Sequence, residues 1–172
     1  MKHTVIVING KGGVGKDTLC DIAGKHYRTR NVSSVAPIKK LASLCGWNGE
    51  KDDRSRKFLS DLKALTAEYN DFPTRWLREQ YEEFCISDEE VMFVHIREGS
   101  EIDKFLDATG GRAVTLLVRG GKRMPDTRYG NDSDDLVEAY KYDYYFTNDL
   151  PLDKTEEAFC DLLRNIIDKN GF

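Results

Sequence analysis

The chain has 172 residues, a length that fits one domain with a substantial core of its own. Charged residues make up 33% and apolar residues 40%, which argues against a disordered or membrane-embedded chain. The net charge of −4 argues against a nucleic-acid polymer as partner, although the 26 Lys and Arg residues could gather at one phosphate-binding cleft. No apolar run approaches the about 20 residues that a membrane span needs, so we expect a cytoplasmic protein with no membrane partner.

The first elements along the chain are predicted to be a strand, a glycine-rich loop and a helix. Residues 5–8 form a continuous apolar, β-branched run, which is typical of a strand buried on both faces of a parallel sheet. Glycines follow at once, and apolar residues then recur at helical spacing over 16–27. This order of strand, loop and helix is typical of a phosphate-binding unit.

The next part of the chain is predicted to be largely helical. After a short strand candidate at 32–35, a helix over 37–46 starts at a proline and stops at a glycine. Two further helices are expected over 52–70 and from Pro73 onward. Because they stand between one buried strand and the next, we interpret 48–86 as a helical insertion beside the sheet that could hold an acceptor substrate.

Strands and helices alternate in the rest of the chain. Three more strand candidates are the apolar runs at 91–96, 113–118 and 144–146. Ser100 with Asp103 resembles a capped helix start, and an apolar stripe predicts a C-terminal helix. The segment 119–135 is polar, contains glycine and is dense in charge, as expected for a mobile lid loop. The alternation predicts a single domain with a three-layer α/β/α fold around a mostly parallel five-stranded sheet.

The glycine-rich loop carries the strongest motif of the chain. It matches the G-x-x-x-x-G-K pattern of the ATP-binding P-loop through Gly10, Lys11, Gly12, Gly13, Val14, Gly15 and Lys16. Glycines let successive backbone N–H groups turn toward phosphates, and the N-terminus of the following helix adds partial positive charge. Lys16 would place a point charge at the β- and γ-phosphates, so ATP is the expected cofactor.

The two residues after this lysine are candidates for coordinating a metal ion. Asp17 stands where a Ser or Thr hydroxyl usually reaches Mg²⁺, and Thr18 follows one residue later. A carboxylate is a hard oxygen ligand, so Asp17 could coordinate Mg²⁺ directly or through water. It could instead be an acidic residue that favours the first turn of the helix.

Four segments resemble one kinase family. Gly15-Lys16-Asp17-Thr18 resembles the P-loop of the deoxynucleoside monophosphate kinases of phage and bacterial type, and it is also similar to that of animal-type phosphomevalonate kinase. The segments 36–47, 52–62 and 142–149 then resemble, in order, the second segment, the charged helix and the closing strand with its Asn-Asp turn in the first family. The resemblance implies a nucleoside monophosphate kinase-like P-loop NTPase fold and an ATP- and Mg²⁺-dependent phosphotransferase with a small phosphorylated acceptor.

The chain departs from this family at two acidic positions. Ala36 replaces an Asp of the second segment, and His95 replaces the Asp of a strand end that commonly reads Asp-Val-Arg-Phe, so that only Arg97 carries over cleanly. The change at His95 removes a carboxylate that could organise a metal ion. A histidine at a sheet end can also be a structural residue without ligand partners.

The resemblance and the placement of charges together indicate the site residues. Phosphoryl transfer depends on positioning and charge neutralisation, so several cations should converge on the phosphates. The expected catalytic residues are Lys16, Arg97, Arg123 and Arg128; Arg119 and Asn148 join the loop from Gly10 to Thr18 at the nucleotide, and Lys39, Arg56 and Arg97 bind the acceptor. Solvated surface charge is the alternative for each of these arginines and for Lys39.

Aromatic residues of the insertion offer a further acceptor contact. A nucleobase would need an aromatic platform, which Trp47, Tyr69, Trp76 or Tyr81 could provide, although the same residues could belong to the core.

Other functions remain compatible with the sequence. The nearest changes only the acceptor, to phosphomevalonate or dephospho-coenzyme A. A different class is the dimeric ATPase switch of the partition and division-site type, whose loop resembles 11–16 and in which Lys11 would act across a dimer. A third is a nucleotide-binding protein without catalysis, which Ala36 and His95 would favour. Both a monomer and a homodimer agree with these readings.

Overall fold

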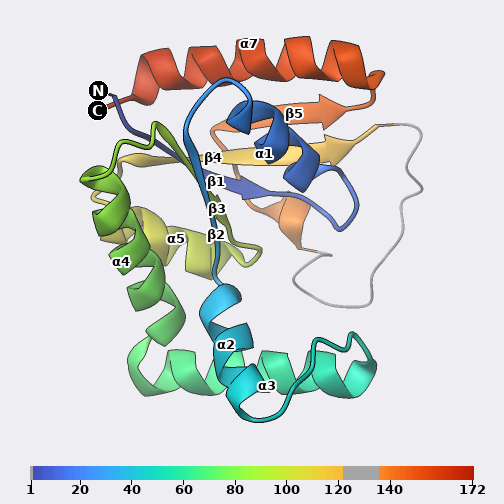
Figure 1. Cartoon of the computed structure of the whole chain (residues 1–172), viewed down its shortest axis with the longest axis vertical. Coiled ribbons are helices and arrows are strands. Elements are labelled where there is room, and N and C mark those ends of the chain that lie inside the picture. Colours follow the sequence, from blue (N-terminus) through green and yellow to red (C-terminus); the bar gives the residue numbers. More distant parts are fainter. Residues whose placement is uncertain (1, 122–135) are drawn as a thin grey trace.

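The computed structural model describes residues 2–121 and 136–172 and shows a five-stranded sheet with helices on both faces (Figure 1). The strands are β1 (Thr4–Asn9), β2 (Thr29–Ser33), β3 (Val91–His95), β4 (Ala113–Gly120) and β5 (Tyr144–Asn148). Their spatial order is β2-β3-β1-β4-β5, and every neighbouring pair is parallel. The predicted three-layer α/β/α fold is confirmed, and the sheet that was expected to be mostly parallel is wholly parallel among the described strands.

β1 lies at the centre of the sheet, which explains its uninterrupted apolar run. Its side chains alternate between two faces, and all six of its residues are buried. On one face Ile6 and Ile8 belong to the core formed with α1 (Lys16–Gly24) and α7 (Leu152–Asn170). On the other face Val5 belongs to the core under α4 (Phe72–Cys85) and α5 (Gly99–Ala108).

The two remaining α-helices lie beyond the sheet rather than on one of its faces (Figure 1). α2 (Ala36–Leu44) leads from β2 to α3 (Asp53–Asn70), which contacts α2 and α4. The expected start of α3 is confirmed, because a carboxylate oxygen of Asp52 accepts a hydrogen bond of 2.7 Å from the backbone N–H of Ser55. Ser55 is the only buried residue of α3, and Tyr69 is largely exposed despite the apolar stripe.

Two of the predicted element starts are wrong by two residues or more. β2 spans Thr29–Ser33 rather than 32–35, because this edge strand is only half-buried and pairs with β3 through backbone groups that need no apolar pattern. α5 begins at Gly99, two residues earlier than a cap at Ser100 would give, so Ser100 lies inside the helix. Its N-cap residue is Glu98, which makes no side-chain cap bond.

α7 is the longest helix described, with 19 residues, and its sequence explains its position over the sheet. Its buried residues Thr155, Phe159, Leu163 and Ile166 recur every three or four positions, which places them on one stripe. The remaining positions are largely polar. None of the helices in the described parts of the chain is long and apolar enough to cross a membrane.

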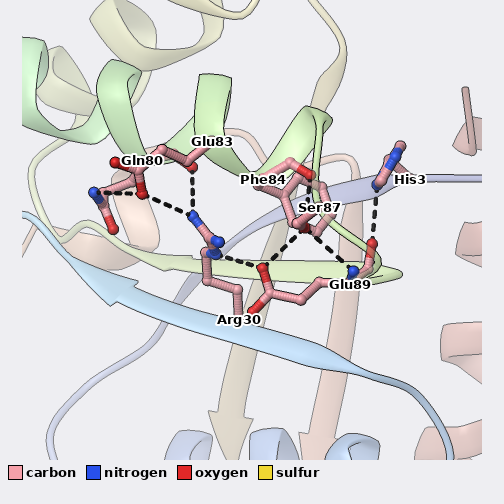
Figure 2. A network of polar contacts seen from close by, with 7 residues as sticks. All are labelled: His3, Arg30, Gln80, Glu83, Phe84, Ser87 and Glu89. Atoms are coloured by element: carbon pink, nitrogen blue, oxygen red, sulfur yellow. Dashed lines mark hydrogen bonds and ion pairs between the residues drawn. The ribbon is translucent and has the colours of Figure 1, made fainter.

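A polar network ties the elements together at the amino ends of the strands (Figure 2). Arg30, near the start of β2, has its Nε 2.6 Å from a carboxylate oxygen of Glu89 and its Nη1 3.3 Å from one of Glu83. The same Nη1 donates to the carbonyl oxygen of Gln80 on α4 at 3.1 Å. His3, just before β1, has its Nδ1 2.9 Å from the carbonyl oxygen of Glu89. These contacts join β2, α4 and the start of β3 at the edge opposite the glycine-rich loop.

Candidate nucleotide-binding site

The glycine-rich loop joins β1 to α1 at the carboxyl ends of the strands. Two of its glycines have a backbone conformation that other residues rarely adopt. Gly10 has a φ of 150°, and a Cβ atom there would lie 2.4 Å from the carbonyl oxygen of Val118. Gly15, the N-cap residue of α1, has a φ of 91°, and a Cβ atom would lie 2.6 Å from Nδ2 of Asn148. Both glycines therefore let the loop turn tightly against the ends of β4 and β5.

Lys16 turns back over this loop. Its ammonium nitrogen donates to the carbonyl oxygens of Gly10 and Lys11, at 2.5 and 3.0 Å. Lys16 is also the first residue of α1, so its charge adds to the partial positive charge of the helix N-terminus. The loop thus presents an ammonium group, a helix N-terminus and a glycine-lined turn at one place, which fits the phosphates of a nucleotide.

Asp17 and Thr18 lie in the first turn of α1, and both are exposed. Among the described residues, no group of three or more His, Cys, Asp or Glu side chains could hold a metal ion. Mg²⁺ in nucleotide sites usually keeps several waters and takes one or two carboxylates together with phosphate oxygens. Asp17 fits that arrangement as a single carboxylate beside the phosphate loop.

Asn148 ends β5 and supports the loop from below. Its Nδ2 donates a hydrogen bond of 2.9 Å to the carbonyl oxygen of Val14. Its Oδ1 lies 3.4 Å from the hydroxyl of Thr155, near the start of α7. Asn148, which was expected at the nucleotide, therefore lies at the phosphate loop, with its side chain bonded to the loop backbone.

Asn9 is a site residue that the sequence reasoning missed. It ends β1, is buried, and its Oδ1 accepts a hydrogen bond of 2.8 Å from the backbone N–H of Gly10. Its Nδ2 donates to the carbonyl oxygen of Arg97 at 3.0 Å and to the hydroxyl of Tyr142 at 2.8 Å. The available signal was a lone amide side chain directly between the buried apolar run and the first glycine.

His95 ends β3 on the same edge and is held beside α1. Its Nε2 lies 3.9 Å from the Sγ of Cys20. Burial lowers the pKa of His95, Asp17 opposes that shift, and Lys16 adds to it. Burial also raises the pKa of Cys20 to about 12, with Asp17 and Asp21 contributing, so this thiol stays protonated.

Two of the predicted catalytic and nucleotide-binding arginines, Arg97 and Arg119, lie near the carboxyl ends of β3 and β4, and the other two lie outside the described residues. Arg97 follows β3 by two residues and is exposed. Arg119, near the end of β4, donates to both carboxylate oxygens of Glu138 at 2.8 to 3.1 Å and lies over the ring of Tyr145, 4.7 Å from its centroid. These hydrogen bonds raise the pKa of Arg119. Arg123 and Arg128 lie outside the described residues, as does most of the predicted lid loop.

Two of the three predicted acceptor residues lie on the two helices beyond the sheet, and the third is the arginine that follows β3. Lys39 is exposed on α2, and Arg56 on α3 is exposed with its Nη1 3.8 Å from a carboxylate oxygen of Asp53. A hollow of about 440 Å³ opens between the end of α2 and the start of α3, and its lining includes Trp47 and Arg54. Arg54 was not predicted, because helical spacing alone does not say which arginine of α3 faces a neighbour.

The remaining aromatic candidates differ in their surroundings. Tyr81 is buried, and Trp76 packs against the same core, so both belong to the layer between α4 and the sheet. Tyr69 is exposed on α3. Trp47 is half-buried, and its indole N–H donates to the carbonyl oxygen of Glu50 at 3.0 Å. Trp47 is therefore the aromatic candidate that lines the hollow.

Known proteins resemble this chain in structure rather than in sequence. No protein-family model matches the sequence, and no curated protein matches it. The tunicamycin resistance protein of Deinococcus radiodurans is similar with a TM-score of 0.56 and 13% identity, over 94% of this chain and 95% of that one. A putative kinase from Chloroflexus aurantiacus is similar with a TM-score of 0.54 and 12% identity, over 96% of this chain and 98% of that one. Thymidylate kinase from Candida albicans has a TM-score of 0.53 and 11% identity, over 98% of this chain and 93% of that one.

The chain shares the three-layer α/β/α fold of these proteins. The similarity extends along nearly the whole length of both chains in each comparison. At this level of identity the similarity concerns the fold alone, and the chemistry has to be argued from the site.

Proposed function

We propose that the protein is an ATP-dependent phosphotransferase that moves the γ-phosphate to a nucleoside or deoxynucleoside monophosphate. The observation that carries this proposal is the phosphate loop, in which the Lys16 ammonium, the N-terminus of α1 and two glycines with positive φ meet at one place. Such a site suits a chain of phosphates and has room for backbone N–H groups to approach them.

The chemistry needs charge neutralisation more than acid or base groups. A phosphate oxygen of the acceptor attacks the γ-phosphorus, the bond from this phosphorus to the β–γ bridging oxygen breaks, and ADP leaves. Lys16 would neutralise charge on the β- and γ-phosphates, and Arg97, at a neighbouring strand end, would orient the acceptor phosphate. Mg²⁺ held near Asp17 would supply further neutralisation between the β- and γ-phosphates.

The hollow between α2 and α3 supports a monophosphate with an aromatic base as acceptor. Trp47 offers a flat apolar surface for a base, and Arg54 offers a cation for a phosphate. We propose that the insertion holds the acceptor here, with Lys39 and Arg56 on the same two helices, and that Arg123 and Arg128 act from the lid loop. Arg119 and Asn148 would complete the nucleotide site.

The test is production of ADP from Mg-ATP in the presence of a panel of candidate acceptors. The panel contains nucleoside and deoxynucleoside monophosphates, phosphomevalonate and dephospho-coenzyme A. We expect turnover that depends on a nucleoside monophosphate, and we expect Lys16→Ala to lower it about 10²- to 10³-fold because a point charge on the transferred phosphate is lost. Lys169→Ala, an exposed lysine near the end of α7, is the matched control and should keep full activity.

Other outcomes of the panel would replace the proposal. Turnover only with phosphomevalonate or dephospho-coenzyme A would keep the phosphotransferase and change the acceptor. Binding of Mg-ATP with no turnover for any acceptor would contradict the proposal and favour an ATPase switch or a protein that binds nucleotide without catalysis.

A further inference from the structure

A buried chain of hydrogen bonds runs from the segment before β5 to the start of the phosphate loop. Tyr142 and Asn9 have only 3% and 1% of their surface exposed. The Tyr142 hydroxyl donates to the carbonyl oxygen of Val137, in the short 3₁₀ helix η1 (Val137–Ala139), at 2.9 Å. The same hydroxyl accepts a hydrogen bond of 2.8 Å from Nδ2 of Asn9. The polar groups of Tyr142 and Asn9 therefore have hydrogen-bond partners, which are each other and nearby backbone groups.

The chain of hydrogen bonds continues through the peptide groups of the loop to Lys16. Oδ1 of Asn9 accepts from the backbone N–H of Gly10, and the carbonyl oxygen of Gly10 accepts from Nζ of Lys16. The Gly10 residue is thus bound at both ends, by an asparagine on its nitrogen and by the lysine on its oxygen. Because these bonds fix the orientation of the loop start, the position of the Lys16 ammonium depends on the side chain of Asn9.

Asn9 also reaches the second predicted catalytic residue. Its Nδ2 group has two hydrogens, one for Tyr142 and one for the carbonyl oxygen of Arg97, 3.0 Å away. The backbone of Arg97 is therefore held against the same amide that holds Gly10. The Asn9 side chain therefore connects the end of β1 with the segment after β3 and with the segment that enters β5. Lys16 follows β1 along the chain, and Arg97 follows β3.

Burying these two polar side chains costs desolvation free energy, and packing of the core alone would not require it. A buried hydroxyl and a buried amide each need partners, and an apolar pair of similar size would pack at the same place without that requirement. Burial also raises the pKa of Tyr142 to about 12, so the hydroxyl keeps its proton and can donate and accept at once. A neutral, fully bonded network of this kind specifies one arrangement of the strand ends.

We propose that Asn9 and Tyr142 are positioning residues for phosphoryl transfer: they fix the Gly10 peptide, and through it they set Lys16 and Arg97 relative to each other. The proposal rests on the proposed function of the same site. It predicts that removing one buried hydroxyl, 133 residues along the chain from Asn9, weakens nucleotide binding.

The first experiment compares Tyr142→Phe with Tyr140→Phe by calorimetric titration of the full chain with Mg-ATP. Each substitution removes one hydroxyl, and the two rings lie 5.1 Å apart, but the hydroxyl of Tyr140 donates to Asp103 on α5 at 2.7 Å rather than to the Asn9 network. We expect the Kd of Tyr142→Phe for Mg-ATP to rise about 3- to 10-fold, the size of one hydrogen bond, with one binding site per chain retained. Tyr140→Phe should keep the wild-type Kd.

A purely structural role would give a different result. It would lower the melting temperature or the fraction of competent protein in Tyr142→Phe, and the Kd of the competent fraction would not change. An unchanged Kd in Tyr142→Phe, or an equal change in Tyr140→Phe, would therefore overturn the positioning role. Failure of the wild-type chain to bind Mg-ATP would instead overturn the proposed function, so the two failures are distinguishable.

A second experiment tests whether the two residues act through one another. If Tyr142 acts through Asn9, the double variant Asn9→Ala/Tyr142→Phe should bind Mg-ATP no more weakly than Asn9→Ala alone. Additive losses would contradict the connection between them. If Asn9→Ala does not fold, Asn9→Ser, which keeps a small polar group, takes its place, and the single Tyr142→Phe titration still decides the proposal.

Discussion

At the amino ends of the strands the guanidinium of Arg30 lies 2.6 Å from a carboxylate oxygen of Glu89 (Figure 2). At the carboxyl ends the ammonium of Lys16 donates to the carbonyl oxygens of Gly10 and Lys11. The ion pair at the amino edge joins β2 to the segment before β3, whereas the carboxyl edge combines the ammonium group with the N-terminus of α1, whose backbone N–H groups favour an anion. The first edge is therefore suited to holding elements together, and the second is suited to receiving an anion.

Substitutions at the two edges should therefore have different effects on stability and on nucleotide binding. At the amino edge, side chains from β2, α4 and the turn before β3 bond to each other, so a loss there should appear in the free energy of unfolding. At the carboxyl edge, the Lys16 ammonium and the Asn148 amide donate to backbone carbonyl oxygens of the loop. A loss at that edge should appear mainly in nucleotide binding.

The largest effect is expected from a side chain placed at the start of the loop. In Gly10→Ala the new Cβ would meet the Val118 carbonyl oxygen at 2.4 Å, and neither strand end can move without disturbing the sheet. We expect the free energy of unfolding to fall by about 3 kcal/mol, from strain and overpacking together, and binding of Mg-ATP to be lost. Urea unfolding and calorimetry measure the two effects.

Gly49→Ala is the matched control for this substitution. Gly49 has a similarly positive φ of 96°, but no atom lies within 4 Å of a Cβ atom there. It should cost about 1 kcal/mol through the backbone conformation alone and leave Mg-ATP binding unchanged. Equal effects at the two glycines would show that contact with β4 does not matter.

A smaller effect, confined to stability, is expected at the amino edge. Arg30→Met leaves the Glu89 carboxylate without its guanidinium partner, and both side chains are largely but not fully buried, with 20% and 25% exposed. After allowance for solvent screening, we expect the free energy of unfolding to fall by about 1–3 kcal/mol, with the Kd for Mg-ATP unchanged. Arg75→Met, at an exposed position of α4, should change neither quantity. A weaker Kd in Arg30→Met would mean that the two edges are coupled.

The parts of this molecule that could be predicted from sequence are those with local signals. The apolar run before Gly10, the glycines and the helical spacing after Lys16 are contiguous, so they identified β1, the loop and α1 without knowledge of the rest. The alternation of strands and helices was enough for the three-layer fold. β2 was misplaced because an edge strand does not require an apolar run.

The contacts that complete the site carry no such local signal. Asn9 meets Tyr142 across 133 residues, and Asn148 meets Val14 across 134, so neither partner is visible in a window around the other. The same limitation applies to Arg54, whose place at the hollow depends on how α3 is rotated against α2. Sequence spacing shows which residues share a helix face, and packing decides what that face meets.

The smallest expected effect concerns His95, at the carboxyl edge beside α1. Burial lowers the pKa of His95 in the folded state below its ordinary value of 6.5, whereas the unfolded chain has the ordinary value. Between these two pKa values the unfolded state binds a proton that the folded state does not, so stability falls as pH decreases through and below about 6.5. We expect urea midpoints measured at pH 7.5, 6.5 and 5.5 to fall more steeply in the wild type than in His95→Asn. His26→Asn, a substitution on the surface, should retain the wild-type loss at low pH. Identical pH profiles for wild type and His95→Asn would contradict a pKa of His95 that is lowered in the folded state.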